Sequence, residues 1–148
     1  MPEILLDTSF LLPTLGVEVE EISSKDLETL RGIRQRTGLC CSHVSFVEIL
    51  GLLGKSKKVD DSAVRMGIKS LFASGAYRWV TPSSSAIHLA FELRSKGHKD
   101  NIDNILYATA VDSGMLFLSL DKELKGFLLE NGYDTDTIVA IKDLPGRV

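Results

Sequence analysis

The sequence lacks the features that mark disulfide-rich, membrane-spanning and secreted proteins. Its only cysteines, Cys40 and Cys41, are adjacent, and a disulfide between neighbouring residues would strain the backbone. We therefore expect two reduced, buried strand residues in a cytoplasmic protein. No apolar run approaches the roughly 18 residues that a bilayer requires. The N-terminus has no basic segment leading into an apolar one, so we expect no signal peptide.

Several motifs for catalysis or ligand binding are also missing. The histidines have no metal-ligand spacing, so we interpret His43 as a strand residue and His88 and His98 as surface residues. The segment Gly51–Gly54 lacks the Lys-Ser/Thr pair that follows a phosphate-binding loop, and no G-x-S-x-G nucleophile motif occurs. These absences leave the acidic residues as candidates for a catalytic or metal-binding role.

The chain does have the composition of an ordinary globular protein. Its 148 residues, 44% hydrophobic and 25% charged, suit one domain over residues 1–148. The net charge of −3 argues weakly against non-specific nucleic-acid binding. The charge is unevenly distributed, because Lys25–Lys99 contains 13 basic and 6 acidic residues and the remainder contains 4 and 14. Either a basic rim beside an acidic centre or a mosaic of solvated helix surfaces explains this division.

Short apolar runs alternate with amphipathic segments along most of the chain. The runs predict strands at residues 4–6, 39–43, 77–80, 115–120 and 137–141. Helices are predicted at residues 25–36, 45–53, 60–72, from Pro82 to Gly97, 101–113 and 122–129, after a broken helical stretch that follows Ser9. This alternation favours an α/β sandwich around a mostly parallel sheet.

Four acidic residues stand where such a sheet binds ligands, beyond the carboxyl ends of its strands. Asp7 and Asp121 directly follow predicted strands, and Glu48 and Asp103 lie in the first turns of predicted helices. All four could therefore converge on one edge of the sheet.

Each acid also has a purely structural interpretation. Ser45 and Glu48 fit a capping box, and Asp100 and Asp103 form a similar arrangement in which Asp100 is a helix cap. Asp121 could cap the helix that begins at Lys122, and Asp7 could close an Asx turn. Capping explains Asp7 least well, because carboxylates that gather at a buried strand end repel one another unless a cation neutralises them.

The four motifs LLDTS, SHVSFVEILG, DNILYATA and LSLD together resemble the PIN-domain ribonucleases, and especially the VapC-like toxins of prokaryotic toxin–antitoxin pairs. The resemblance covers the chain from Ile4 to about Leu129. It implies a PIN-like three-layer α/β/α fold with catalytic residues Asp7, Glu48, Asp103 and Asp121. Ser119 stands where this family more commonly has threonine, and it keeps the hydroxyl group.

The resemblance also implies hydrolysis of single-stranded RNA by in-line attack of a water. Carboxylates without His or Cys ligands suit Mg²⁺ or Mn²⁺. Asp7, Asp103 and Asp121 would hold the metal directly or through water, and Glu48 would hold a second metal or orient the water. Ser9 or Ser119 would position a carboxylate or a water. A rim of basic residues could contact RNA phosphates, although solvated helix faces explain them equally well: Arg31, Arg34, Arg36, Lys55, Lys57 and Lys58.

The expected partners are an antitoxin protein and a second copy of the chain. The family commonly dimerises, and the apolar residues near Leu11 and at Ile49–Leu53 exceed what one domain buries. One alternative is a haloacid-dehalogenase-like phosphatase, but that class needs a second Asp two residues after the first, where Ser9 stands here. A receiver domain of a signalling relay fits no better. The other alternative is a non-catalytic PIN-fold subunit for RNA binding or RNA maturation.

Overall fold

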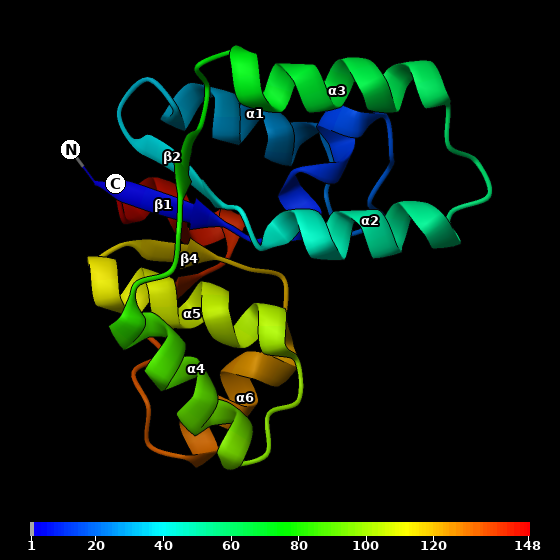
Figure 1. Ribbon diagram of the computed structural model, residues 1–148. Coiled ribbons are helices and arrows are strands. Elements are labelled where there is room, and N and C mark those ends of the chain that lie inside the picture. Colours follow the sequence, from blue (N-terminus) through cyan, green and yellow to red (C-terminus); the bar gives the residue numbers. More distant parts are fainter. Residues whose placement is uncertain (1) are drawn as a thin grey trace.

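A parallel five-stranded sheet forms the centre of the molecule (Figure 1). The computed structural model describes residues 2–148. The strand order is β3-β2-β1-β4-β5, and every pair of neighbours is parallel. The strands are β1 (Glu3–Leu6), β2 (Gly38–Ser42), β3 (Arg78–Val80), β4 (Leu116–Leu118) and β5 (Ile138–Val139). The predicted α/β class and parallel sheet are therefore confirmed.

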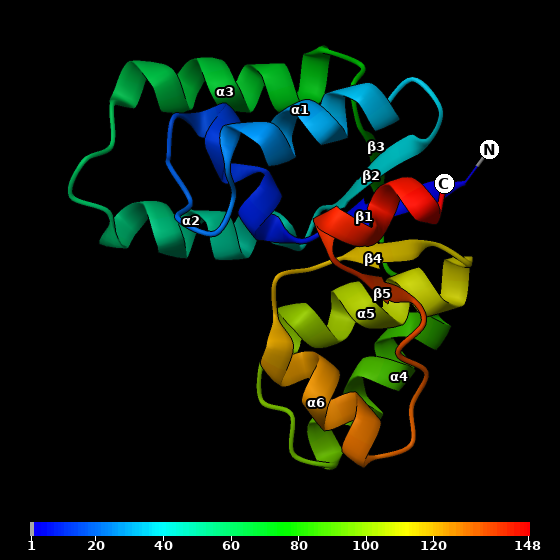
Figure 2. The same ribbon diagram turned by 180° about the vertical axis from the view of Figure 1, so that it is seen from behind.

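Helices cover both faces of the sheet and complete the three predicted layers (Figures 1 and 2). One face carries α1 (Ser24–Ile33), α2 (Ser45–Lys55), α3 (Asp61–Ala73) and the 3₁₀ turns η1 (Thr8–Phe10), η2 (Leu12–Leu15) and η3 (Ile141–Gly146). The other face carries α4 (Ser84–Ser95), α5 (Asn101–Ser113) and α6 (Lys122–Glu130).

Side chains alternate between two hydrophobic cores, one on each face of the sheet. In β1, Ile4 and Leu6 pack into the core under α1, whereas Leu5 packs into the core under α5 and α6. Cys41 and Cys40 divide in the same way, and both are free and buried as predicted. This alternation is what a strand buried on both faces requires.

Several element boundaries differ from those expected. The helix predicted to stop at Leu53 continues to Lys55, because a glycine at the exposed position 54 costs only about 1 kcal/mol and does not end a helix. The helix predicted from Pro82 begins one residue after its cap, Ser83, whose hydroxyl accepts a hydrogen bond from the backbone N–H of Ala86 at 3.1 Å. The last strand is only two residues long, because η3 begins at Ile141.

The histidines also differ in part from expectation. His43 follows β2 rather than lying in it, and its exposed ring lies 5.6 Å from Trp79. His88 is exposed as expected, whereas His98 is half-buried and hydrogen-bonded. Across residues 2–148, no helix combines the length and apolar character needed to cross a bilayer.

Candidate active site

An acidic pocket of about 330 Å³ opens beyond the carboxyl ends of β1 and β4. Asp7 follows β1, Glu48 lies in the first turn of α2, Asp103 lies in the first turn of α5, and Asp121 caps α6. The fold thus brings together the four acidic residues that the sequence predicts for the site. The pocket is lined by Asp7, Ser9, Glu21, Glu48, Leu52, Asp100, Asp103, Leu120 and Asp121.

Asp7 is the most constrained carboxylate of the pocket. Only 6% of it is exposed, and both of its oxygens accept hydrogen bonds. Oδ1 accepts from the backbone N–H of Thr8 at 2.7 Å, and Oδ2 accepts from the hydroxyl of Ser119 at 3.2 Å. Burial, followed by the negative charge of Glu48, raises the pKa of Asp7 to about 6, although the two hydrogen bonds oppose the rise.

Glu48 does not form the predicted capping box with Ser45. The cap position of α2 is Val44, which makes no side-chain capping bond. The hydroxyl of Ser45 is buried and accepts a hydrogen bond from the hydroxyl of Thr8 at 3.1 Å. Burial raises the pKa of Glu48, and the negative charges of Asp100 and Asp121 add to the rise. The carboxylate is therefore oriented into the pocket rather than used to satisfy its own helix.

Asp100 and Asp121 both cap helices, as the structural interpretation predicted. Asp100 Oδ1 accepts from the backbone N–H of Asp103 at 3.0 Å. Asp121 Oδ1 accepts from the backbone N–H groups of Glu123 at 2.9 Å and Leu124 at 3.1 Å. Each carboxylate has a second oxygen, so capping and membership of the acidic pocket are compatible.

The pKa values of Asp103 and Asp121 are shifted in opposite directions. Burial, followed by a hydrogen bond to Asp121, raises the pKa of Asp103, which is 6% exposed. The same hydrogen bond lowers the pKa of Asp121. Burial and the neighbouring carboxylates therefore both disfavour a negative charge on Asp103 when no cation is bound.

The donor set of the pocket fits a hard divalent cation. Carboxylate oxygens of Glu48, Asp100 and Asp103 all lie within 4.8 Å of one another. Within residues 2–148, no Lys or Arg lines the pocket. Oxygen-only ligands of this kind suit Mg²⁺ or Mn²⁺ rather than Zn²⁺, which favours His and Cys.

Two hydroxyl groups complete the surroundings of the carboxylates. Ser119 donates to Asp7, and its oxygen accepts from the backbone N–H of Asp121 at 3.0 Å, so it connects two of the acids. Ser9 lines the pocket. Glu21 also lines it, and sequence reasoning missed this residue because an acid in the segment before α1 has no distinguishing pattern.

The basic residues proposed for RNA binding lie outside the acidic pocket. Lys55 and Lys57 are exposed at and beyond the end of α2, as is Lys58. Lys55 follows Glu48 and Leu52 at helical spacing, so it lies on the face of α2 that lines the pocket. Arg31 and Arg34 instead line a second cavity, and Arg36 is exposed just beyond α1.

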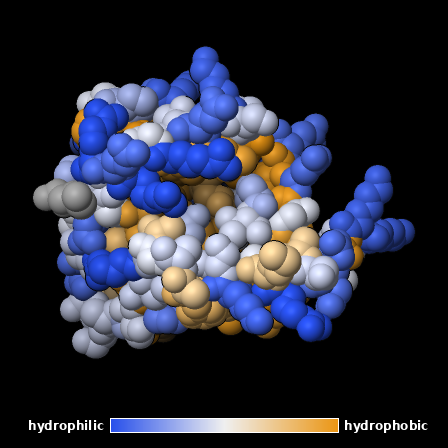
Figure 3. Space-filling view, turned by 90° about the horizontal axis from the view of Figure 1, so that it is seen from above, coloured by the Kyte–Doolittle hydropathy of each residue, from blue (hydrophilic) through white to orange (hydrophobic). Residues whose placement is uncertain are grey.

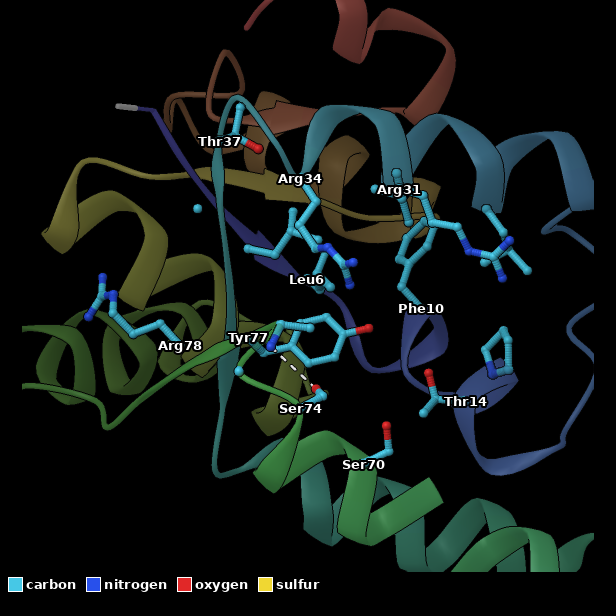
Figure 4. Close-up of a pocket in the computed structure, with 17 residues that line it drawn as sticks. Leu6, Phe10, Thr14, Arg31, Arg34, Thr37, Ser70, Ser74, Tyr77 and Arg78 are labelled. Carbon is cyan, nitrogen blue, oxygen red and sulfur yellow. Dashed lines mark hydrogen bonds between the residues drawn. The ribbon is translucent and has the colours of Figure 1, made fainter. Parts of the chain in front are cut away.

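This second cavity, here called the basic-rimmed cavity, has a volume of about 940 Å³ between α1, α3 and the starts of β2 and β3. Its floor is apolar and includes Leu6, Phe10 and Leu30. Viewed from above, the molecule shows a hollow with a hydrophobic floor and hydrophilic surroundings (Figure 3). Arg34 points toward Tyr77 across the cavity (Figure 4).

Comparison with known proteins identifies both a sequence family and a set of similar folds. The family model for the PIN domain matches residues 4–127. No curated protein is significantly similar to the chain. One similar solved structure is VapBC2 from Rickettsia felis bound to a DNA fragment from its promoter. It is 12% identical in sequence with a TM-score of 0.65, and the match covers 93% of this chain and 96% of that chain.

Two further solved structures have the same fold at low identity. PAE2754 from Pyrobaculum aerophilum is 18% identical with a TM-score of 0.62, covering 99% of this chain and 88% of that one. A toxin–antitoxin complex from Klebsiella pneumoniae is 13% identical with a TM-score of 0.59, covering 93% and 97%.

Proposed function

The chain belongs to the PIN domain family, and from that premise we propose that it is a divalent-metal-dependent endoribonuclease that hydrolyses phosphodiester bonds of single-stranded RNA. We propose further that it is the toxin of a toxin–antitoxin pair and that residues 1–148 form one nuclease domain. Its two free, buried cysteines suit the reducing cytoplasm, where we place it.

One observation carries the catalytic part of the proposal. Carboxylates from four separate elements meet in one pocket, and Asp7 and Asp103 are each only 6% exposed. Burying several like charges without a cation is costly, which is why the pKa values of Asp7, Glu48 and Asp103 are raised. A fold retains such a cluster when a ligand of opposite charge offsets it.

Each residue of the pocket has a proposed role that follows from its position. Asp7, Asp103 and Asp121 would hold the ion, which when bound lowers the pKa of a water and offsets negative charge on the phosphodiester. Glu48 and Asp100, whose oxygens lie near each other, would hold a second ion or orient the attacking water. Ser119 would keep Asp7 and Asp121 in place. Ser9 would position a water.

Lys55 and Lys57 support the RNA part of the proposal. Lys55 shares a helix face with Glu48, so its ammonium group is available to a phosphate that enters the pocket. Arg31 and Arg34, which line the other cavity, would contact RNA only beyond the reacting nucleotides.

The basic-rimmed cavity supports the antitoxin as a protein partner. Among the residues that the structure describes, neither Arg31 nor Arg34 is paired with a carboxylate, and both stand over an apolar floor. An acidic, partly apolar segment of a partner would satisfy both properties. One solved structure with this fold is a toxin–antitoxin complex.

Exposed apolar side chains support a homodimer. On α2, Val47 and Leu50 are 68% and 67% exposed, and on α4 Phe91 is 65% exposed. A contiguous apolar patch on the surface commonly marks a protein interface, and Val47 and Leu50 are adjacent on one face of α2 because they are three residues apart in the helix.

The test is cleavage of a panel of single-stranded RNAs with Mn²⁺ or with EDTA. We expect cleavage by wild type in Mn²⁺ alone and none by Asp7→Asn, with Glu130→Gln on the exposed end of α6 as the charge control. Equal cleavage by wild type and Asp7→Asn would contradict the proposal. RNA binding without cleavage would favour the non-catalytic PIN-fold subunit, and hydrolysis of a small phosphomonoester would favour the phosphatase.

A further inference from the structure

A buried pair outside the acidic pocket joins the elements that carry three of its carboxylates. Asn104, which is fully buried in α5, donates from Nδ2 to the backbone carbonyl of His98 at 2.8 Å. The His98 Nδ1 and the Asn104 Oδ1 are 2.6 Å apart. Two hydrogen bonds therefore hold the loop between α4 and α5 against the first turns of α5.

These contacts show which atom of the imidazole ring donates to Asn104. The backbone carbonyl of His98 accepts only, so it must face the amide nitrogen of Asn104 and leave the amide oxygen for the ring. An amide oxygen also accepts only, so Nδ1 of His98 carries the proton. The ring is thus held in one orientation by its neighbour in α5.

The other side of the ring contacts α6. The His98 and Phe127 rings lie 5.2 Å apart at 45°. Asp121 caps the same helix. One side chain therefore touches the loop that ends at Asp100, the helix that carries Asp103 and the helix that Asp121 caps.

We propose that His98 and Asn104 form a positioning pair that sets the relative placement of Asp100, Asp103 and Asp121. The pair itself does not line the acidic pocket. Arg94 also holds the loop before α5, because it donates to the carbonyl of Lys99 at 2.6 Å. Of these two side chains, His98 is the one whose contact reaches α6, through the ring of Phe127. This inference rests on the proposed metal site.

The experiment measures Mn²⁺ affinity of the full chain from the electron paramagnetic resonance signal of free Mn²⁺. His98→Asn places an amide N–H where Nδ1 stands, whereas His98→Gln places it one bond farther, where Nε2 stands. His98→Leu has no N–H group at either position. His88→Leu on the exposed face of α4 is the control. Groups that orient metal ligands typically change affinity by 10–100-fold.

We expect His98→Leu and His98→Gln to bind Mn²⁺ about tenfold more weakly than wild type. His98→Asn keeps the hydrogen bond to Asn104 but loses the ring contact with Phe127, so its affinity should lie between those of wild type and His98→Gln. A loss of stability alone would lower the Tm of His98→Asn and His98→Gln alike and would not separate their affinities. Because this comparison uses two polar variants, it remains decisive if His98→Leu does not fold.

Hydrogen exchange gives a readout that needs no metal. The N–H groups of Glu123 and Leu124, which bond to Asp121, should exchange faster in His98→Gln and His98→Asn than in wild type, because both variants lose the ring contact with α6. If wild type binds Mn²⁺ and all variants match it, the positioning pair is overturned and the metal site stands. If wild type binds no Mn²⁺, the metal site is wrong and this inference falls with it.

Discussion

Among single residues, Asp7 is a buried carboxylate whose charge weakens the fold when no metal is bound. Its pKa is about 6 in the folded protein against 3.8 ordinarily, so the folded state binds the extra proton between those values. Stability therefore falls as the pH rises from about 4 to about 6, and stays lower above that range. The shift corresponds to about 3 kcal/mol at most.

The Asp7→Asn variant should remove this dependence. In EDTA at pH 8 we expect it to be more stable than wild type by about 2 kcal/mol, because the asparagine carries no charge. Its amide oxygen can still accept from the N–H of Thr8, and its amide nitrogen can donate to the Ser119 oxygen. At pH 4 the difference should disappear. Urea unfolding at the two pH values measures it, and a variant that is less stable than wild type at pH 8 would refute the assignment.

Ser119 offers a test of how the acids are held. Ser119→Ala removes the bonds to Asp7 and Asp121, and Mn²⁺ affinity should fall about tenfold. Ser119→Thr keeps the hydroxyl and should retain most of the affinity. Isothermal titration with Mn²⁺ separates the two, and equal affinities for both variants would show that the hydroxyl does not position the carboxylates.

Asp100 separates capping from metal binding. Asparagine caps a helix as well as aspartate does, so Asp100→Asn should leave the unfolding free energy nearly unchanged while weakening Mn²⁺ binding. Asp100→Ala should also lose about 1 kcal/mol of stability. If Asp100→Asn binds Mn²⁺ like wild type, this residue is a cap and nothing more.

Sequence reasoning reached some of these residues because their positions follow from periodicity. Asp7 and Asp121 stand at the ends of apolar runs, and the ends of parallel strands meet at one edge of the sheet. Glu21 and the contacts of His98 could not be found in this way. Both depend on how loops fold against distant helices, which no local pattern encodes.

At the scale of elements, α3 packs unusually closely on η2. A Cβ added to Gly67 would lie 2.4 Å from the backbone oxygen of Thr14 and 2.9 Å from the Cα of Leu15. Both are backbone atoms, so they cannot move aside cheaply. This contact fixes α3 over the turns that follow Asp7.

Gly67→Ala should therefore destabilise the protein by about 2 kcal/mol. Gly51→Ala on α2 is the matched control, because nothing lies within 4 Å of its added Cβ, and it should stabilise the helix by about 0.5–1 kcal/mol. Chemical denaturation measures both. A neutral Gly67→Ala would mean that α3 and η2 are less tightly packed than described.

The sequence predicts whether a segment is a helix or a strand more reliably than it predicts where that element ends. The helix at residues 101–113 was predicted to the residue, because Asp100 caps it and Gly114 ends it in a left-handed conformation. The strand predicted at residues 115–120 shortens to Leu116–Leu118, since the residues that follow it turn into the acidic pocket. The end of this strand therefore depends on tertiary structure around the pocket rather than on the local apolar pattern.

In the whole molecule, the acidic and the basic residues gather partly in different places. The acidic pocket lies at the carboxyl ends of the strands, and the basic-rimmed cavity lies near the starts of β2 and β3. Residues 6–10 run between them, with Leu6 and Phe10 lining the cavity and Asp7 and Ser9 lining the pocket. The sequence left open a basic rim beside an acidic centre or a mosaic of solvated helix surfaces. Of the basic residues named for the rim, Arg31 and Arg34 line the other cavity, whereas Lys55 lies on the face of α2 that lines the pocket.

Carboxylates distant in the chain share one pocket, and we propose that a divalent ion balances their charge there. Anomalous scattering from a crystal soaked in Mn²⁺ is the sharpest test of this proposal. We expect a peak among Asp7, Glu48, Asp103 and Asp121, within ligand distance of at least two carboxylates. A crystal at saturating Mn²⁺ with no peak in this pocket would overturn the proposed metal site.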